Sequence, residues 1–246
     1  SLFQSELPRI LAGDVLVEGH PVTKAGHGVA EEVDIRLRGE ALPFVSRAGL
    51  KLAGALDHWP LDPTGRTCFD AGSSTGGFTD CLLQRGAARV YAVDVGTNQL
   101  HWKLRSDPRV VSLEQTNLRT WEPGKIPERC SLLVADLSFI SLKLAIPPVL
   151  ASLTEDADAV LLVKPQFEAG REDVGEGGIV RDPEVHRRVV REIWTYFAGT
   201  ALRPMDLTPS PIKGGEGNTE FLLRLGMGAS PGDLERILEF EFGSQN

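Results

Sequence analysis

Four ionisable residues stand beside short apolar runs of the kind that form buried strands or an amphipathic helix. Asp136 ends "LLVAD", Lys164 ends "VLLVK" and Glu220 precedes "FLLRL". Lys51 belongs to "SRAGLKL", within a helical pattern that runs from residue 47 to about residue 57. Ligands of an open α/β sheet bind beyond the carboxyl ends of its parallel strands, so we expect Asp136 and Lys164 to face that crevice. A lysine or a carboxylate in such a place could exchange a proton with a ligand, although a strand-end aspartate could equally cap a helix and a strand-end lysine could equally face solvent.

A glycine-rich stretch, "FDAGSSTGGFTD" at residues 69–80, is followed by "VYAVDVG" at residues 90–96. The order of strand, glycine turn, helix, strand and acid is typical of sites for adenosine-containing cofactors. Asp94 lies 22 residues after Gly72, where a carboxylate accepts hydrogen bonds from ribose hydroxyls. The dinucleotide pattern G-x-G-x-x-G is absent, and Asp70 suits the amino group of a methionine moiety better than a pyrophosphate. We therefore favour S-adenosylmethionine over a dinucleotide, with a turn that merely packs as the remaining alternative.

The expected cofactor site takes further residues from neighbouring strand ends. Phe139 would pack on the cofactor, and Asn117 would reach the adenine unless it is a turn residue. The histidines have no metal-ligand spacing, so no metal site is expected. The full expected set is Asp70, Gly72, Ser73, Ser74, Thr75, Gly76, Gly77, Asp94, Val95, Asn117, Asp136 and Phe139.

Strands and helices that alternate along the chain must position these residues. Asp182 and Pro183 suit the start of the clearest helix, and Gly199 suits its end. The alternation predicts a doubly wound, Rossmann-like α/β sheet. Two final strands without a helix between them predict an antiparallel C-terminal strand. Strand patterns cover residues 66–72, 88–95, 110–115, 130–137, 157–164, 201–210 and 218–225, and helix patterns cover 47–57, 76–86, 144–154 and 182–199.

Residues 1–40 show a different pattern of apolar and polar residues, which predicts a small α+β unit. A hairpin turn is expected at Glu18-Gly19, with a further strand within residues 30–37. Pro43 marks a linker. The predicted organisation is this unit, a linker at residues 41–46, a catalytic domain at residues 47–228 and an acidic tail at residues 229–246.

Charge and cysteine content narrow the class of protein. The net charge of -8 weighs against a strong, nonspecific nucleic-acid binder, and residues 1–40 carry four basic and seven acidic side chains, a balance of -3. The three cysteines form no C-x-x-C motif, so neither a disulfide framework nor a zinc site is supported, and a reducing cytoplasm is expected. The sequence indicates no signal peptide and no membrane-spanning run, so we expect no stable membrane association.

The motifs "SRAGLKL", "VADLSF", "LVKPQFE" and "GNTEFLL", arranged around "DAGSSTGGFTD", resemble those of the FtsJ-type ribose 2′-O-methyltransferases. Together with "YAVDVGTNQL", "DLSFISL" and "GGIVRDPEVH", they resemble more closely the TlyA family of ribosomal RNA methyltransferases, whose members are also called haemolysins. The resemblance extends from residue 10 to about residue 226. It implies a class I S-adenosylmethionine-dependent fold preceded by an S4-type RNA-binding unit, which we expect to be truncated here because its usual first helices have no counterpart.

The resemblance also implies a Lys-Asp-Lys-Glu tetrad of Lys51, Asp136, Lys164 and Glu220, acting on a cytidine ribose of ribosomal RNA within a ribosomal subunit. Lys164 would be the general base, and Asp136 would also lie near the sulfonium. A free lysine, with a pKa of about 10.4, is protonated at neutral pH. Lys51, as a nearby cation, would lower the pKa of Lys164, whereas the carboxylates of Asp136 and Glu220 would raise it. The direction of the net shift therefore stays open.

Other interpretations remain open at this point. Arg47 would contact RNA phosphate or else pair with an acid on the surface. The alternatives to an RNA methyltransferase are a pore-forming haemolysin, a noncatalytic ribosome-binding protein and a small-molecule methyltransferase.

Overall fold

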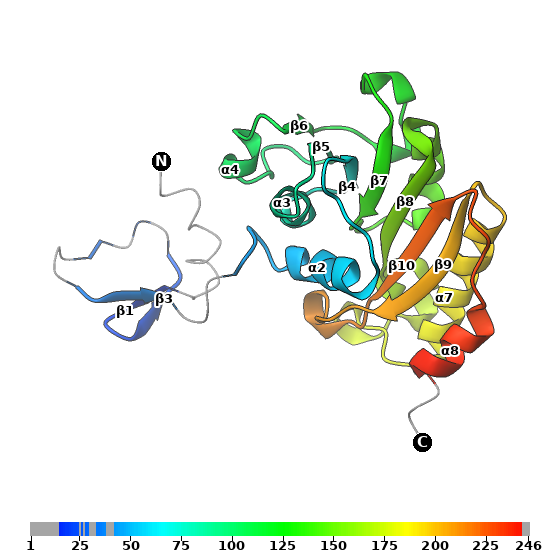
Figure 1. Cartoon of the computed structure of the whole chain (residues 1–246). Helices are drawn as coiled ribbons and strands as arrows, with labels where there is room; N and C mark the ends of the chain where they lie inside the picture. The colour runs from blue at the N-terminus through cyan, green and yellow to red at the C-terminus, as the bar shows by residue number, and fades with distance from the viewer. Residues whose placement is uncertain (1–14, 25, 27, 30–32, 38–41, 243–246) are drawn as a thin grey trace. The chain divides into compact units, whose positions relative to one another are not determined.

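The computed structural model describes residues 15–24, 26, 28–29, 33–37 and 42–242, and it divides into two units, Ser1–Pro43 and Phe44–Asn246. In the first unit, strands β1 (Val15–Val17), β2 (His20–Val22) and β3 (Ile35–Leu37) form an antiparallel sheet in the order β2-β1-β3 (Figure 1). Glu18 and Gly19 have φ values of 52° and 79°, the left-handed conformation that a tight hairpin turn needs, so the expected turn is confirmed. Residues 10–14 and 30–32, where the N-terminal resemblance and the third strand were expected to begin, lie outside the described residues.

The second unit is built on a seven-stranded sheet in the order β6-β5-β4-β7-β8-β10-β9. Strands β4 to β8 pair with one another in parallel, and β10 runs antiparallel between β8 and β9. The doubly wound sheet and the antiparallel C-terminal strand are therefore confirmed. The strands are β4 (Thr67–Ala71), β5 (Arg89–Val93), β6 (Val110–Leu113), β7 (Cys130–Ala135), β8 (Leu153–Val163), β9 (Leu202–Pro209) and β10 (Phe221–Met227).

Helices cover both faces of this sheet, because successive strand residues point to opposite faces. On β4, Phe69 and Ala71 belong to one core cluster and Cys68 belongs to the other. Figure 1 shows α2 and α3 on one side of the sheet and α7 and α8 on the other. The helices are α2 (Ala48–His58), α3 (Gly77–Gln84), α4 (Trp102–Arg105), α5 (Leu142–Ala145), α6 (Pro165–Glu168), α7 (Pro183–Ala198) and α8 (Leu234–Phe242).

The longest of these helices, α7, begins and ends as its sequence predicts. Asp182 accepts a hydrogen bond of 2.9 Å from the backbone N–H of Glu184, and Gly199 follows the last helical residue. Such a side-chain acceptor satisfies one of the N–H groups that a helix start leaves without a partner. Neither α7 nor any other described helix is long and apolar enough to cross a membrane.

The prediction of one helix at residues 144–154 is wrong. The chain forms the short helix α5 and then a 3₁₀ segment, Pro147–Ser152. Pro147 and Pro148 have no N–H to donate, and each ring clashes with the preceding helical turn, so the α-helical hydrogen bonds stop there. Ser141 caps α5 by accepting from the Lys143 N–H at 3.2 Å.

The segment from residue 229, expected as an acidic tail, contains α8, which packs on the second unit. Leu238 is buried, and the ring of Phe242 lies 5.3 Å from that of Phe221 in β10. Glu235 accepts a hydrogen bond of 3.1 Å from Arg191 of α7. Apolar burial on one face and an ion pair on the other therefore attach α8 to α7 and the sheet.

Buried cysteines give the first testable prediction. Cys68, Cys81 and Cys130 are all buried thiols, and burial raises the pKa of each to about 12. Because the thiolate is the reactive form, we predict that native protein at neutral pH releases no chromophore from an aromatic disulfide reagent within minutes. The same protein in denaturant should react at all three thiols at once. Rapid labelling of any thiol under native conditions would contradict this prediction.

Candidate active site

The carboxyl ends of four neighbouring parallel strands meet at one edge of the large sheet. Gly72, Asp94, Asp136 and Lys164 are the first residues after β4, β5, β7 and β8. Glu220 immediately precedes β10, whose first residue pairs with the last residue of β8. The antiparallel direction of β10 thus brings its start to the edge where the parallel strands end.

At this edge, Lys164 pairs with Asp136. Lys164 Nζ lies 2.6 Å from Asp136 Oδ1 and donates a hydrogen bond of 3.0 Å to Ser138 Oγ. The ring of Phe167 lies 5.7 Å from the same Nζ. The amine is therefore held by groups from both the β7 and the β8 loops.

Lys51 pairs with Glu220. Lys51 Nζ donates to Glu220 Oε2 at 2.6 Å, and the two residues are only 7% and 2% exposed. This contact joins α2, which precedes the sheet in sequence, to the start of β10, 169 residues later. Removing both charges from water is costly, so their retention points to a use for them at this edge.

Gln166 of α6 connects the two lysine–carboxylate pairs. Its Nε2 donates to Glu220 Oε1 at 3.3 Å, and it lies two residues after Lys164. The sequence reasoning missed both Gln166 and Ser138. Their signal was present in "LVKPQFE" and "VADLSF", but nothing in either motif says which neighbouring loop a side chain will reach.

The glycine turn after β4 approaches the β7 loop closely. Gly72 has a φ of 81°, and a Cβ atom built there would lie 2.7 Å from the backbone oxygen of Asp136. Gly76 has a φ of 99°, and a Cβ atom there would lie 2.2 Å from Leu104 of α4. Only glycine suits these two positions, because a side chain would meet both a left-handed backbone and a filled space.

Asp94 organises the same turn. Its Oδ2 accepts from the Ser74 N–H at 2.8 Å, and its Oδ1 accepts from the Gly96 N–H at 2.7 Å. The turn also packs outward, since the Thr75 carbonyl accepts from the His101 N–H at 3.1 Å. A carboxylate can accept about four hydrogen bonds, so Asp94 keeps acceptor capacity for a ligand.

Asp70 lies beneath the turn and is fully buried. Its Oδ2 accepts from Thr79 Oγ1 at 2.6 Å, whereas Oδ1 has no hydrogen-bond partner among the described residues. Burial raises the pKa of Asp70 to about 7, and the charges of Asp136 and Asp94 add to the rise while the Thr79 hydrogen bond opposes it. A buried carboxyl oxygen without a partner is energetically unfavourable, and a donor brought to it would lower that cost.

The remaining expected residues surround this edge to different degrees. Asn117 accepts from the Arg119 N–H at 3.0 Å and caps the 3₁₀ turn Leu118–Thr120, so it acts here as a turn residue. Val95 is 72% exposed, and Phe139, with a φ of 63°, is 90% exposed and lies 4.8 Å from the Phe167 ring. Arg47 is exposed just before α2, and its side chain makes no hydrogen bond or ion pair with any residue that the structure describes, although its carbonyl accepts from the Leu50 N–H at 3.0 Å. Ser73 and Gly77 are buried within the turn and the start of α3.

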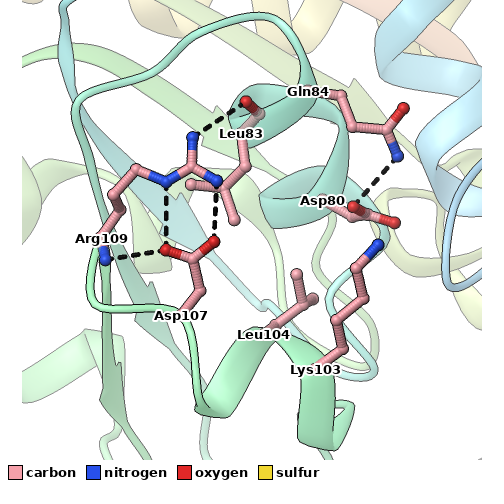
Figure 2. Close-up of a pocket in the computed structure, with 7 residues that line it drawn as sticks. All are labelled: Asp80, Leu83, Gln84, Lys103, Leu104, Asp107 and Arg109. Atoms are coloured by element: carbon pink, nitrogen blue, oxygen red, sulfur yellow. Dashed lines mark hydrogen bonds and ion pairs between the residues drawn. The ribbon is translucent and has the colours of Figure 1, made fainter.

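A separate small pocket lies between α3 and α4 (Figure 2). Two of its charged groups bind each other, since Arg109 Nη2 contacts Asp107 Oδ2 at 2.7 Å, and Gln84 donates to Asp80 at 3.1 Å. It shares no residue with the expected site. Its lining residues are Asp80, Leu83, Gln84, Lys103, Leu104, Asp107 and Arg109.

Known proteins resemble this chain over most of its length. A family model described as FtsJ-like methyltransferase matches residues 44–227. A relative from Mycobacterium tuberculosis, named 16S/23S rRNA (cytidine-2'-O)-methyltransferase TlyA, is 45% identical over 215 residues, which are 87% of this chain and 80% of the relative. A solved structure of a hemolysin-named protein from Streptococcus thermophilus is 39% identical, with a TM-score of 0.80 over 97% of this chain and 94% of that chain.

A more distant structure concerns the fold alone. An S-adenosylmethionine-dependent methyltransferase from Listeria monocytogenes is 16% identical, with a TM-score of 0.55 over 74% of this chain and 99% of that chain. The strand order β6-β5-β4-β7-β8-β10-β9 and this likeness identify the fold as the class I methyltransferase fold.

The raised pKa of Asp70 predicts a dependence of stability on pH. The folded carboxyl titrates near pH 7 and the unfolded one near 3.8, so between these values the unfolded chain loses its proton first and the free energy of unfolding falls as pH rises. Asp70→Asn removes this titration. We expect the stability of the variant relative to wild type to increase by roughly 2 to 4 kcal/mol between about pH 4 and about pH 7, and to stay level above that.

Urea unfolding of both proteins across this pH range measures the difference. Glu122→Gln, a change at an exposed carboxylate, serves as the control and should leave the pH profile unchanged. A constant difference between Asp70→Asn and wild type at every pH would contradict the burial of a titrating carboxyl at this position.

Proposed function

Because the chain belongs to the FtsJ-like methyltransferase family, and within it to the TlyA group, we propose that it transfers a methyl group from S-adenosylmethionine to a ribose 2′-hydroxyl of ribosomal RNA. One observation carries the proposal. Two lysine–carboxylate pairs, the partly buried Lys164–Asp136 and the buried Lys51–Glu220, lie at the sheet edge where the glycine turn follows β4. Such a cluster beside a cofactor turn suits proton removal from a hydroxyl.

The residues at the glycine turn fit S-adenosylmethionine. Gly72, with its positive φ and no side chain, lets the turn after β4 pack closely against the β7 loop. Asp70 Oδ1, buried without a hydrogen-bond partner among the described residues, would balance the positive amino group from beneath the turn, directly or through a water. Asp94 at the end of β5 would bind the ribose hydroxyls. The exposed Val95 and Phe139 would lie along the rest of the cofactor, whereas the side-chain oxygen of Asn117 already caps a 3₁₀ turn.

Each charged residue has a proposed part in the reaction. When bound, S-adenosylmethionine supplies a methyl group on a positively charged sulfur. Lys164, as general base, accepts the proton of the ribose hydroxyl, and Asp136 and Ser138 hold its Nζ in place. Lys51 and Glu220 would line the site beside the Lys164–Asp136 pair. Holding the reacting groups in one geometry contributes much of the rate in such sites.

Ribosomal RNA as substrate is supported by the name of the Mycobacterium tuberculosis relative, which also narrows the nucleotide to cytidine. The exposed Arg47 would contact RNA phosphate, and the three-stranded N-terminal unit would act as an S4-like RNA-binding unit. A ribosomal RNA substrate would place the protein in the cytoplasm, bound transiently to ribosomal subunits and without stable membrane association.

Hemolysin-named relatives make pore formation the second candidate function. Pore formation gives no reason to bury the Lys51–Glu220 pair, and to shield Lys164 and Asp136 partly from water, at the end of a doubly wound sheet, at the desolvation cost that this entails. A noncatalytic ribosome-binding protein would have no use for the cluster either. Leakage of plain liposomes on addition of the purified protein would favour the pore.

The function is tested with methyl-labelled S-adenosylmethionine and isolated small and large ribosomal subunits. We expect the label to enter a cytidine ribose, at a position mapped by the resistance of the methylated linkage to alkaline cleavage. Absence of label in every ribosomal RNA offered, with cofactor binding intact, would overturn the proposal.

The proposed base is tested by Lys164→Ala. Loss of a general base lowers the rate of methyl transfer by about 100-fold or more, while cofactor affinity measured by calorimetry should not change, because the glycine turn is intact. Lys125→Ala is the control, since Lys125 is an exposed lysine in the 3₁₀ turn Pro123–Lys125, before the start of β7. Near-normal turnover of Lys164→Ala would show that another group takes the proton.

A further inference from the structure

Glu168 is the last residue of α6 and touches none of the four proposed catalytic residues through a recorded hydrogen bond or ion pair. Its Oε2 accepts from Ser141 Oγ at 2.6 Å, and its Oε1 accepts from the Leu142 N–H at 2.7 Å. Ser141 and Leu142 begin α5, which follows the β7 loop. One carboxylate on the β8 side therefore binds two donors on the β7 side.

The two segments that Glu168 joins are the ones that carry the Lys164–Asp136 pair. Asp136 lies five residues before Ser141, and Lys164 lies four residues before Glu168. The Lys164–Asp136 pair joins the two loops where they leave β7 and β8, and the Glu168 carboxylate joins them at their far ends. Between them, Lys164 Nζ also donates to Ser138 Oγ at 3.0 Å, and the rings of Phe139 and Phe167 meet at 4.8 Å.

The β7 loop needs such a restraint. Phe139 has a φ of 63°, a left-handed conformation that costs a non-glycine residue about 1 kcal/mol or more. Phe139 is also 90% exposed, so packing contributes little to holding it. A strained and exposed residue three positions after Asp136 persists only if both ends of its loop are held.

Partial burial of the Glu168 carboxyl is energetically unfavourable for its charged form. Desolvation raises the pKa of its carboxyl, and the hydrogen bonds from Ser141 and Leu142 oppose the rise. A carboxylate whose two oxygens each bind a donor offsets much of the cost of its burial. The arrangement thus suits a side chain that ends in two polar atoms, each able to bind one of two neighbouring groups.

We propose that Glu168 is a positioning residue: it ties the β8 loop to the start of α5 and so holds Asp136 and Lys164 at reacting distance. This inference rests on the proposed function, because its readout is methyl transfer. Glu168, at the end of the "LVKPQFE" motif, would therefore act through the Lys164–Asp136 pair and not by contacting the substrate.

The test compares Glu168→Ala and Glu168→Gln with wild type at saturating cofactor and ribosomal substrate. Small displacements of reacting groups lower rates steeply, so Glu168→Ala should reduce kcat by roughly 10- to 100-fold, while cofactor Kd and substrate KM stay unchanged. Glu168→Gln should recover most of the rate. Its amide oxygen can accept from the Leu142 N–H, and its amide N–H can donate to Ser141 Oγ.

Glu192→Gln is the matched control, because it removes a neighbouring half-exposed carboxylate on α7 that binds Lys143 and Arg188 and neither loop. It should keep the wild-type kcat. Ser141→Ala, which removes one of the two donors, should give an intermediate loss even if Glu168→Ala folds poorly.

Three results would overturn the inference: wild-type kcat in Glu168→Ala, equal losses in Glu168→Ala and Glu168→Gln, or a loss of cofactor affinity that parallels the loss of rate. A wild-type protein that methylates no RNA would overturn the proposed function as well, whereas an active wild type with an equally active Glu168→Ala would overturn the positioning role alone.

Discussion

The contact between Lys164 and Asp136 is the interaction on which the rest of the site depends. An ammonium and a carboxylate with little access to water are tolerated only when they lie close together and are hydrogen-bonded further. Parallel pairing of β7 with β8 brings them together, with Ala135 opposite Leu161. Since β8 continues to Val163, Lys164 starts farther along the sheet edge than Asp136, and its long side chain reaches back to the carboxylate.

The second pair imposes a constraint of longer range. Lys51 and Glu220 come from opposite ends of the methyltransferase unit, so their contact requires α2 to fold back onto the edge and β10 to start there. Close packing makes the first possible, because a Cβ atom on Gly77 of α3 would lie 2.8 Å from the backbone nitrogen of Gly49 in α2. The antiparallel insertion of β10 beside β8 makes the second possible. The same edge therefore receives charges from the first helix of the unit, from two central strands and from its last strand.

Local signals predicted most of the fold because they act over a few residues. Asp182 caps α7, Gly76 turns into α3 with positive φ, and short, nearly continuous buried runs mark the central strands β4, β5 and β7. The prediction failed where two local signals competed. Apolar periodicity favoured one helix at residues 144–154, whereas Pro147 and Pro148 favoured its end, and the missing backbone donors of the prolines prevailed.

The sequence by itself determined the class I fold, the glycine turn and the identity of the four charged residues that motifs bring to the sheet edge. Only the tertiary structure decided the pairing, in which Lys164 lies with Asp136 and Lys51 with Glu220, and it alone revealed Ser138, Gln166 and Glu168. The physical reason is range. Backbone preferences and burial patterns are properties of neighbouring residues, whereas a hydrogen bond between loops depends on strand register and loop path, which no single segment encodes. Asp70 illustrates the same limit, because its type was visible in the sequence and its complete burial beneath the turn was not.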